Sequence, residues 1–576
     1  MNRNRNKELA ELFRLTAVMI EILEDNVFRA RAFDRAATTI EGIEEDICNL
    51  ATSGEIEALP GIGKALSRHI INWCRHGTFD EYEKLKETFP PGLLEVLQIP
   101  GLGPKKVRSL YTELGITSLG ELEYACLENR LIGIKGFGLK TQQKILSAIE
   151  ERRKIEKFRH APNAYKLAEE FADLLKNLPG VRDVKLVGAL RRFEEYTDDI
   201  DLLVDADSSE WIETLAAGKI KSGKSPLLES FSASRDELDR VRIRGVFENM
   251  AVDIRQTWGA GAFFVYTGNR AHVEAVLSLG ALQGLTAREL LAGDFRDESE
   301  IYRHFGLSFI PPELREGMEE IDAARNGAVP VLITEKDIKG IFHVHTTSSD
   351  GSLSLERVVS LCVESGYEYV GISDHSVSAA YAGGLTEEKL KRQREEIESL
   401  RERYPQIDIY WGIESDIRPD GALDYPDHIL EAFDFVIGSV HSHFKMDRSA
   451  MTERILKAMR HPCLTMLGHP TGRLILARAG YELDMDAVLE TAKEHRKILE
   501  LNAHPYRLDL NWINCKKARA LGVPISINPD AHNVEDFSLR YGIFAARKGW
   551  LTANDVWNAK TREEMKRLMM EKPWRK

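Results

Sequence analysis

The chain has 576 residues, enough for three or more domains at roughly 100–200 residues each. With 43% hydrophobic and 29% charged residues, it has the composition of an ordinary soluble globular protein. Its formal net charge of −13 excludes a uniformly basic coat for nucleic acid. DNA binding stays open, because acidic metal sites count as negative until their ions bind.

The cysteines and the N-terminus bear on where the protein works. Six cysteines are scattered singly, with no CxxC pair. This pattern argues against a disulfide framework and a zinc ribbon, and it fits a reducing cytoplasm, where we expect the protein. Residues 1–24 predict an amphipathic helix interrupted by acids, which is neither a signal peptide nor a membrane span. We therefore expect no membrane association.

Residues 1–155 predict short helices joined by glycine turns. Three turns share an apolar residue, a GxG and an amphipathic helix with basic residues, at 59–70, 99–110 and 134–145. The glycines allow a tight turn and close backbone approach, and the amides that open the next helix form an anion site. This helix-hairpin-helix pattern grips a DNA phosphate without reading bases. The predicted DNA-binding residues are Gly61, Gly63, Lys64, Gly101, Gly103, Lys105, Gly136, Gly138 and Lys140.

Mixed strands and helices follow. Residues 181–207 predict a strand, a glycine turn with paired arginines, and a second strand entered by acids. Strand side chains alternate, so Asp199 and Asp201 lie on one face. A later strand brings Asp253, and residues 263–269 follow as a predicted strand and turn. Three carboxylates from two strands are suited to holding a pair of Mg²⁺ ions that align an attacking oxygen with a nucleotide phosphate.

The C-terminal part repeats one pattern six times: an apolar, strand-like run that stops at a histidine or acid. The runs are 341–350, 369–376, 407–415, 434–443, 464–470 and 524–532. Active sites of α/β barrels are built at strand C-terminal ends, and imidazole with carboxylate is a ligand set for Zn²⁺, Mn²⁺ or Fe²⁺. So many ligands exceed the need of one ion, which predicts a multinuclear site for hydrolysis. The predicted ligands are His343, His345, Asp350, His375, Glu414, His441, His469, Asp530 and His532.

These HxH, DH, E, H, H and DxH motifs resemble the PHP (polymerase and histidinol phosphatase) domain over roughly residues 336–570. The resemblance implies a distorted seven-stranded (β/α) barrel holding about three divalent ions, Mn²⁺ or Zn²⁺. Asp374 stands beside His375 in the DH motif, and we expect it to support the site rather than bind an ion.

The earlier motifs carry a second resemblance. The order G-x-x-R-R, D-x-D, strand Asp and YTG turn resembles the nucleotidyltransferase palm of family X DNA polymerases, the polymerase beta type, over about residues 1–320. With the barrel, the whole chain is similar to bacterial and archaeal PolX-type proteins. The resemblance implies deoxynucleoside triphosphates and gapped, nicked or 3′-ended DNA as partners, and catalytic Mg²⁺ at Asp199, Asp201 and Asp253. It implies nucleotide contacts at Gly188, Arg191, Arg192, Thr267 and Gly268.

The polymerase half departs from that family at several contact positions. The usual Gly-Ser of the phosphate turn is Gly188-Ala189 in this chain. Phe193 stands where the family has a small residue after the paired arginines, and Asp198 replaces the glycine before Asp199. Two further contact positions align with Val273 and Leu277. We therefore expect the metal chemistry to survive while nucleotide affinity and selectivity weaken.

One further departure concerns the lyase step of polymerase beta relatives. That reaction needs a lysine amine for a Schiff base, and the aligned residue is His69. Lys64 lies five residues earlier and points to a different side of the helix start. We expect little lyase activity, whether His69 replaces a catalytic or only a surface lysine.

The predicted fold is multidomain, with a helix-hairpin-helix region, an α+β palm and thumb, and an α/β barrel. The predicted boundaries are 1–85 for an N-terminal helical domain, 86–155 for a fingers-like region, 156–325 for palm and thumb, 326–340 for a linker and 341–576 for the PHP domain.

We interpret the chain as a monomeric DNA repair enzyme that combines gap-filling polymerase with an Mn²⁺-favoured 3′–5′ exonuclease. Two alternatives stay open: a nuclease whose inactive palm only presents DNA, and a phosphatase of small phosphoesters. The helix-hairpin-helix repeats count against the phosphatase, because a small substrate needs no DNA clamp.

Overall fold

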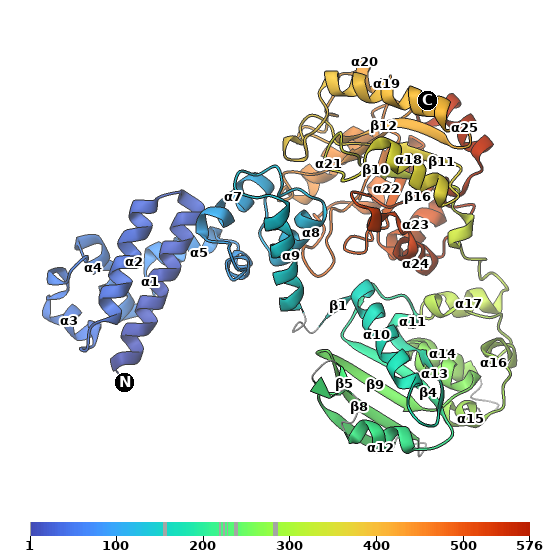
Figure 1. Ribbon diagram of the computed structural model, residues 1–576, viewed down its shortest axis with the longest axis horizontal. Coiled ribbons are helices and arrows are strands. Elements are labelled where there is room, and N and C mark those ends of the chain that lie inside the picture. Colours follow the sequence, from blue (N-terminus) through green and yellow to red (C-terminus); the bar gives the residue numbers. More distant parts are fainter. Residues whose placement is uncertain are drawn as a thin grey trace. The chain divides into compact units, whose positions relative to one another are not determined.

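The computed structural model describes residues 2–153, 158–217, 221–222, 225–226, 228–235, 240–279 and 286–575. The chain divides into two compact units, Met1–Ile149 and Glu150–Lys576 (Figure 1). No helix among the described residues combines the length and apolarity needed to span a membrane.

The described part of the first unit is helical. In α1, the apolar positions Leu9, Phe13 and Ile20 are fully buried, and this face packs on α2 as the amphipathic pattern predicts (Figure 1). The helices are α1 (Asn2–Glu24), α2 (Val27–Glu41), α3 (Ile47–Ser53), α4 (Lys64–His76), α5 (Asp80–Thr88), α6 (Leu93–Val96), α7 (Pro104–Leu114), α8 (Leu119–Leu127) and α9 (Leu139–Arg153).

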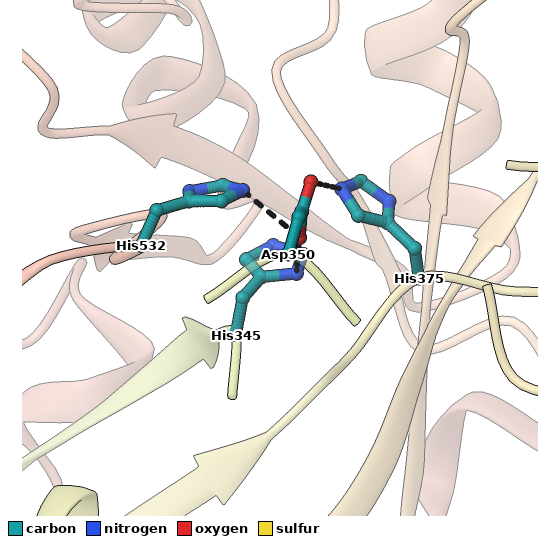
Figure 2. Close-up of side chains that lie close together, drawn as sticks. All are labelled: His345, Asp350, His375 and His532. Carbon is teal, nitrogen blue, oxygen red and sulfur yellow. Dashed lines mark ion pairs between the residues drawn. The ribbon is translucent and has the colours of Figure 1, made fainter. Parts of the chain in front are cut away.

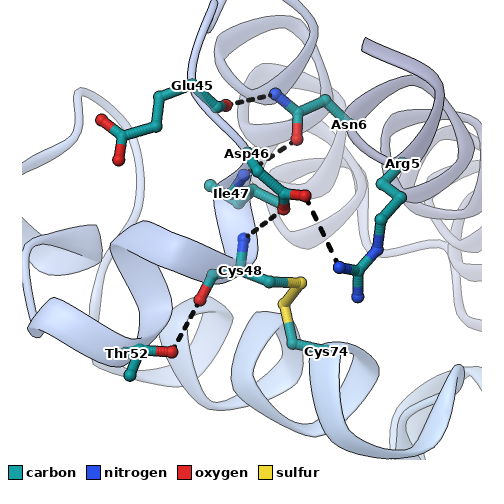
Figure 3. The surroundings of a disulfide bond; sticks show 8 residues. All are labelled: Arg5, Asn6, Glu45, Asp46, Ile47, Cys48, Thr52 and Cys74. Atoms are coloured by element: carbon teal, nitrogen blue, oxygen red, sulfur yellow. Dashed lines mark hydrogen bonds and ion pairs between the residues drawn. A yellow bond between two sulfur atoms is a disulfide. The ribbon is translucent and has the colours of Figure 1, made fainter. Parts of the chain in front are cut away.

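A disulfide joins Cys48 of α3 to Cys74 of α4, with Cα atoms 5.5 Å apart (Figure 3). The expectation of no disulfide framework is wrong for this pair. The two cysteines are 26 residues apart in the sequence, but the turn between the helices brings them within bonding distance. The remaining cysteines are free and buried, as expected for single residues: Cys126, Cys362, Cys463 and Cys515.

The described residues of the predicted palm include a five-stranded sheet in the order β2-β4-β9-β8-β7. Strands β4 and β9 are parallel, and the other neighbours are antiparallel. Helix α10 packs on the sheet, where Phe171 stacks on Phe247. The elements are β1 (Arg159–His160), α10 (Ala161–Lys176), β2 (Val181–Leu186), α11 (Gly188–Arg191), β3 (Tyr196–Thr197), β4 (Asp199–Ala206), α12 (Glu210–Ala216), β5 (Lys221–Ser222), β6 (Ser225–Pro226), β7 (Phe231–Arg235), β8 (Val241–Phe247) and β9 (Met250–Gln256).

Five helices follow the sheet in the described part of the predicted thumb. Residues 263–269 were predicted as a strand and turn, but most of this segment belongs to helix α13, which ends at Thr267. The run is apolar on all sides and buried, and in such a run periodicity cannot separate strand from helix. The thumb helices are α13 (Ala260–Thr267), α14 (Arg270–Leu279), α15 (Ala287–Ala292), α16 (Glu298–His304) and α17 (Glu320–Arg325).

Seven parallel strands in sequential order build the C-terminal barrel, so the predicted fold class is confirmed. A parallel bridge between Val344 and Ala531 connects the first strand to the segment after the last, which nearly closes the barrel. The strands are β10 (Gly340–Val344), β11 (Tyr369–Ile372), β12 (Asp408–Asp416), β13 (Phe435–Ser439), β14 (Met466–Leu467), β15 (Ile498–Asn502) and β16 (Ile525–Asn528).

The barrel strands are buried on both faces, as parallel strands covered by helices must be. Helices follow the strands around the sheet (Figure 1). They are α18 (Leu355–Glu364), α19 (Glu387–Arg403), α20 (Asp427–Leu430), α21 (Arg448–Met459), α22 (Met485–Glu494), α23 (Trp512–Leu521), α24 (Arg540–Lys548) and α25 (Arg562–Glu571).

Candidate functional site

All nine predicted ligands meet at one end of the barrel, in or just after the C-terminal ends of its strands. Figure 2 shows four of them, with the Asp350 carboxylate between the rings of His345, His375 and His532. They form four overlapping groups whose ligand atoms lie within 4.8 Å of one another: His345, Asp350, His375 and His532; His343, His469 and Asp530; His343, His345 and Glu414; His375, Glu414 and His441. Shared members such as Glu414 join these groups into one continuous cluster.

Burial shows that these groups suit cations. His343, His345 and Glu414 are at most 1% exposed. Among the described residues, neither ring nitrogen of His345 has a partner with good hydrogen-bond geometry, although Asp530 Oδ1 lies 3.3 Å from Nε2. Buried polar atoms without hydrogen bonds are costly, and a divalent ion between imidazole and carboxylate would satisfy them. The donor set therefore fits Zn²⁺ or Mn²⁺.

Three of the ligands lie on strained backbone. The φ angles of His343, His469 and Asp530 are +58°, +23° and +51°, in a region that residues with a Cβ rarely adopt. Such strain persists only where the surrounding structure enforces it, and it concentrates at functional sites. Here it turns the three side chains into the common cluster.

Two carboxylates that the sequence interpretation missed hold the ligand rings. Glu500 in β15 accepts from Nδ1 of His343 at 2.6 Å and from the backbone amide of His469 at 2.6 Å. Asp416 lies 2.5 Å from Nδ1 of His441. These contacts fix each ring so that Nε2 faces the cluster. Asp416 could have been found, because it follows the ligand Glu414 by two residues on the same strand face.

Asp374 was expected to support the site rather than to bind an ion. It is fully buried and accepts hydrogen bonds from the backbone and side chain of Thr346, both at 2.7 Å, and from Gln393 at 2.6 Å. It belongs to none of the ligand groups found among the described residues. Its role is to hold the loop after β10, which carries Asp350.

The charges of the cluster depend on one another. Burial opposes a positive His343, but neighbouring carboxylates, first that of Glu500, outweigh burial and raise its pKa well above the usual value. Burial also opposes a charged His375, but Asp350 and then Glu414 raise its pKa well above the usual value. The pKa of His441 is raised in the same way, against burial, by Tyr381 and then by Glu414 and Asp416. Burial disfavours a charged Glu414, but the surrounding imidazoles hold its pKa well below the ordinary range. The raised histidine pKa values therefore place positively charged imidazoles at positions that would also suit metal cations.

The palm brings the predicted catalytic carboxylates together. Asp199 and Asp201 alternate on β4, and Asp201 is the register partner of Asp253 on β9. Burial and then the neighbouring Asp199 raise the pKa of Asp201 to about 6. Gly188 lies against this carboxylate, since a Cβ there would come within 2.1 Å of Asp201 Oδ2. A glycine is therefore required at the phosphate turn.

Arginines surround these palm carboxylates, which the sequence interpretation did not foresee. Arg255 lies 3.4 Å from Asp201 and 3.1 Å from Asp253. Arg242 and Arg244 of β8 also reach Asp253. The register of β8 against β9 creates this cluster, and register cannot be read from either strand alone.

The predicted nucleotide-binding residues form one connected group. Arg191 donates to Thr267 Oγ1 at 2.6 Å, and Arg192 donates to the Thr267 carbonyl at 2.8 Å. Glu298 and Glu316 are their acidic partners. Gly268 follows as the C-terminal cap of α13.

The three glycine turns of the first unit have the same geometry. Their first glycines have φ of +80°, +87° and +91°, at Gly61, Gly101 and Gly136. A Cβ at Gly63, Gly103 or Gly138 would meet nothing within 4 Å, so each turn has an open face. Basic residues begin the following helices, at Lys64, Lys105 and Lys140.

His69 lies in an aromatic cluster. Its ring centroid is 5.8 Å from that of Phe33 and 5.1 Å from that of Phe79. The half-buried position lowers the pKa of the imidazole, mainly through burial. His69 is therefore a packing residue of the first helical domain.

Comparisons with known proteins match the regions that carry these sites. Models of a helix-hairpin-helix domain, a SAM-like helix-hairpin-helix tandem and the PHP domain match residues 4–79, 93–151 and 342–504. "DNA polymerase/3'-5' exonuclease PolX" of Bacillus subtilis (strain 168) is 34% identical over 576 residues, 98% of this chain and 99% of that protein.

The barrel region has shorter relatives. A probable phosphatase of Caldicellulosiruptor saccharolyticus is 29% identical over 211 residues, 34% of this chain and 81% of that protein. Another, from Thermoanaerobacter sp. (strain X514), is 30% identical over 201 residues, 33% of this chain and 77% of that protein. The PolX match spans all the regions, and the chain therefore belongs to the PolX family of DNA polymerase/3′-5′ exonucleases, with a C-terminal PHP domain.

Proposed function

We propose that the barrel trims DNA 3′ ends by metal-dependent phosphodiester hydrolysis, in the same chain as a DNA polymerase. The convergence of nine imidazole and carboxylate ligands at one buried end of the barrel carries this proposal. The divalent ions, Mn²⁺ or Zn²⁺, would supply Lewis-acid activation of water and of the phosphate. The protein holds the ligand rings through Glu500 and Asp416 and keeps the cluster dry.

In the palm, we assign Asp199, Asp201 and Asp253 to a pair of Mg²⁺ ions. Asp253 would also help to take the proton from the primer 3′ hydroxyl, and Arg192 would hold the triphosphate. Gly188 lets the backbone of the phosphate turn lie directly against the Asp201 carboxylate, which brings the turn next to the proposed metal ligands. The substrates are deoxynucleoside triphosphates and gapped or nicked DNA, bound by a monomer in a repair reaction.

The helix-hairpin-helix turns would grip the DNA backbone. Each turn places free amides and a lysine at the start of a helix, where the helix dipole favours a phosphate. Such contacts position DNA without sequence preference. Binding should therefore weaken steeply with salt.

One experiment tests both active sites: primer extension and 3′ shortening on the same 5′-labelled oligonucleotide, with Mg²⁺ or Mn²⁺. His343→Ala with His345→Ala should abolish shortening and keep extension. Asp199→Ala with Asp201→Ala should do the opposite. The control is His428→Ala, which changes an exposed histidine of α20 outside the ligand groups. Full shortening by the His343/His345 variant would place the nuclease elsewhere.

The probable-phosphatase relatives give one alternative, hydrolysis of small phosphomonoesters by the barrel. Turnover of a small phosphomonoester by the full chain, faster than that of a DNA 3′ end, would favour it. The DNA-gripping turns support the nuclease instead.

A further inference from the structure

Barrel helix α24 packs directly on the palm and thumb within the second unit. Its Phe544 stacks on Phe193 with ring centroids 3.7 Å apart and planes 5° apart. The Phe544 ring also lies 5.8 Å from that of Tyr165 in α10, and Arg547 pairs with Glu313. Phe193 stands directly after the paired arginines of the nucleotide site. The stacked rings therefore join the barrel to the segment beside the nucleotide site.

The last residue of α24 brings a buried positive charge to the same place. Lys548 is 1% exposed, and its Nζ lies 3.0 Å from Glu194 Oε1. The amine also contacts Glu316 Oε1 and donates to the carbonyl of Arg192 at 3.4 Å. A buried ammonium is stable only with such partners. Lys548 is thus bound to the palm and thumb by its charge.

Arg192 uses the same two carboxylates. Its Nε lies 3.3 Å from Glu316 Oε1, and its Nη2 lies 3.8 Å from Glu194 Oε1. Two cations therefore face two anions, and one of those cations comes from the barrel. The positive and negative charges must nearly cancel, because the cluster is mostly shielded from water.

We propose that Lys548 is a positioning residue for nucleotide binding in the palm, acting on Arg192 through Glu194 and Glu316. This inference rests on the proposed role of Arg192 as the triphosphate ligand. While Lys548 pairs with the two carboxylates, the Arg192 guanidinium is less fully engaged by them and can bind the triphosphate. Without Lys548, both carboxylates of the cluster pair with the Arg192 guanidinium. The net charge beside the nucleotide site then becomes more negative, which disfavours binding of an anionic substrate.

A purely structural role for Lys548 would have different consequences. Loss of a buried ion pair that only joined the two parts would lower stability and impair both activities together. Loss of charge balance beside Arg192 would raise the KM for nucleotide and leave exonuclease activity unchanged. The ratio of KM to kcat effects separates the two roles.

The test is steady-state gap filling by the full chain, with exonuclease activity measured for every variant. Lys548→Met should raise the nucleotide KM about tenfold, the scale of one hydrogen bond to a charged group, and change kcat less than about twofold. Lys548→Arg keeps the charge and should recover most of the affinity. Lys548→Met combined with Glu194→Gln restores the balance of charge and should recover part of it.

A variant on the palm side keeps the inference testable even if Lys548→Met misfolds. Glu194→Gln alone removes one anion at a partly exposed position and should lower the nucleotide KM by about threefold. An unchanged nucleotide KM for Glu194→Gln, in a variant that keeps full exonuclease activity, would overturn the inference.

Arg192→Ala distinguishes failure of the inference from failure of the proposed function. If Arg192→Ala leaves the nucleotide KM unchanged, Arg192 is not the triphosphate ligand. The proposed role of Arg192 and the inference about Lys548 are then both wrong. If Arg192→Ala raises the KM and Lys548→Met does not, the palm assignment stands and Lys548 only holds the barrel in place.

Discussion

Arg242 on β8 binds both carboxylate oxygens of Asp253, with its Nε 3.0 Å from each. Asp253 is also the neighbour of Asp201 across the parallel β4–β9 pair. The Arg242 guanidinium therefore pairs with the carboxylate oxygens of Asp253 that the proposed palm ions would bind. An incoming ion must displace this group before the palm can extend a primer.

Arg242→Gln should therefore make the palm easier to load with metal. We expect the half-saturating Mg²⁺ concentration for primer extension to fall roughly three- to tenfold, since a partly exposed ion pair contributes about 1 kcal/mol. Primer extension across a Mg²⁺ titration measures this. Arg182→Gln is the matched control, because Arg182 pairs with Asp205 and Asp207 outside the catalytic carboxylates. An unchanged Mg²⁺ requirement would show that Arg242 moves aside without cost.

Removal of metal should destabilise the barrel. Divalent ions that bind only the folded state stabilise it by about 2.7 kcal/mol at a hundred times Kd. Chelation should therefore lower the Tm of the unaltered chain in a thermal scan. His343→Ala with His345→Ala should show a much smaller change, because two shared ligands are gone. Equal shifts in both proteins would point to ions bound elsewhere.

Metal binding to the barrel should weaken as pH falls. The raised pKa values of His343, His375 and His441 mean that these rings carry protons near neutral pH when no ion is bound. A divalent ion must displace those protons, so affinity increases with pH until the rings are neutral without metal. Calorimetric titration with Mn²⁺ in two buffers of different ionisation enthalpy counts the released protons. Binding near pH 6 without proton release would contradict this prediction.

Restoring the usual phosphate turn should improve nucleotide binding. Ala189→Ser supplies a hydroxyl donor, and Asp198→Gly removes a negative charge beside Asp199, whose pKa is raised by burial and then by Asp198. A hydrogen bond to a charged group contributes about 1.5–3 kcal/mol, so the nucleotide KM should fall roughly tenfold for serine alone. Gap-filling kinetics provide the measurement. Efficient, faithful filling by the unaltered chain would show that these departures are harmless.

Lyase activity on a 5′ deoxyribose phosphate should be low. Imidazole forms no stable Schiff base, and His69 is packed between Phe33 and Phe79. Borohydride trapping on an incised abasic substrate should yield little covalent product. A strong band that disappears in Lys64→Ala would mean that Lys64 is the nucleophile.

The barrel ligands were predictable because one chemical pattern recurs at the same place in successive strands. Glu500 was missed, since it lies in the middle of its strand, in a run that reads as an ordinary buried segment with one acid. Its importance comes from its position opposite His343, which only the closed barrel creates. The repeated pattern along the chain thus predicted the ligands, whereas the residues that hold them could be found only from the folded structure.

The palm shows the same limit. The spacing of Asp199 and Asp201 fixed their common face, and their meeting with Asp253 followed from the resemblance. The arginines around Asp253 depend on cross-strand register, and the contact between Phe193 and Phe544 joins residues more than three hundred positions apart. No local pattern encodes either relation.

The disulfide between Cys48 and Cys74 encloses the first glycine turn, with Gly61 and Gly63, in a covalent ring. Closing a loop of this size removes unfolded-state freedom equivalent to roughly 3 kcal/mol. The bond thus restricts the unfolded conformations open to this turn and leaves its folded geometry unchanged. Reduction should therefore lower the free energy of unfolding of the first unit by about that amount, so the redox state would set how often the turn opens.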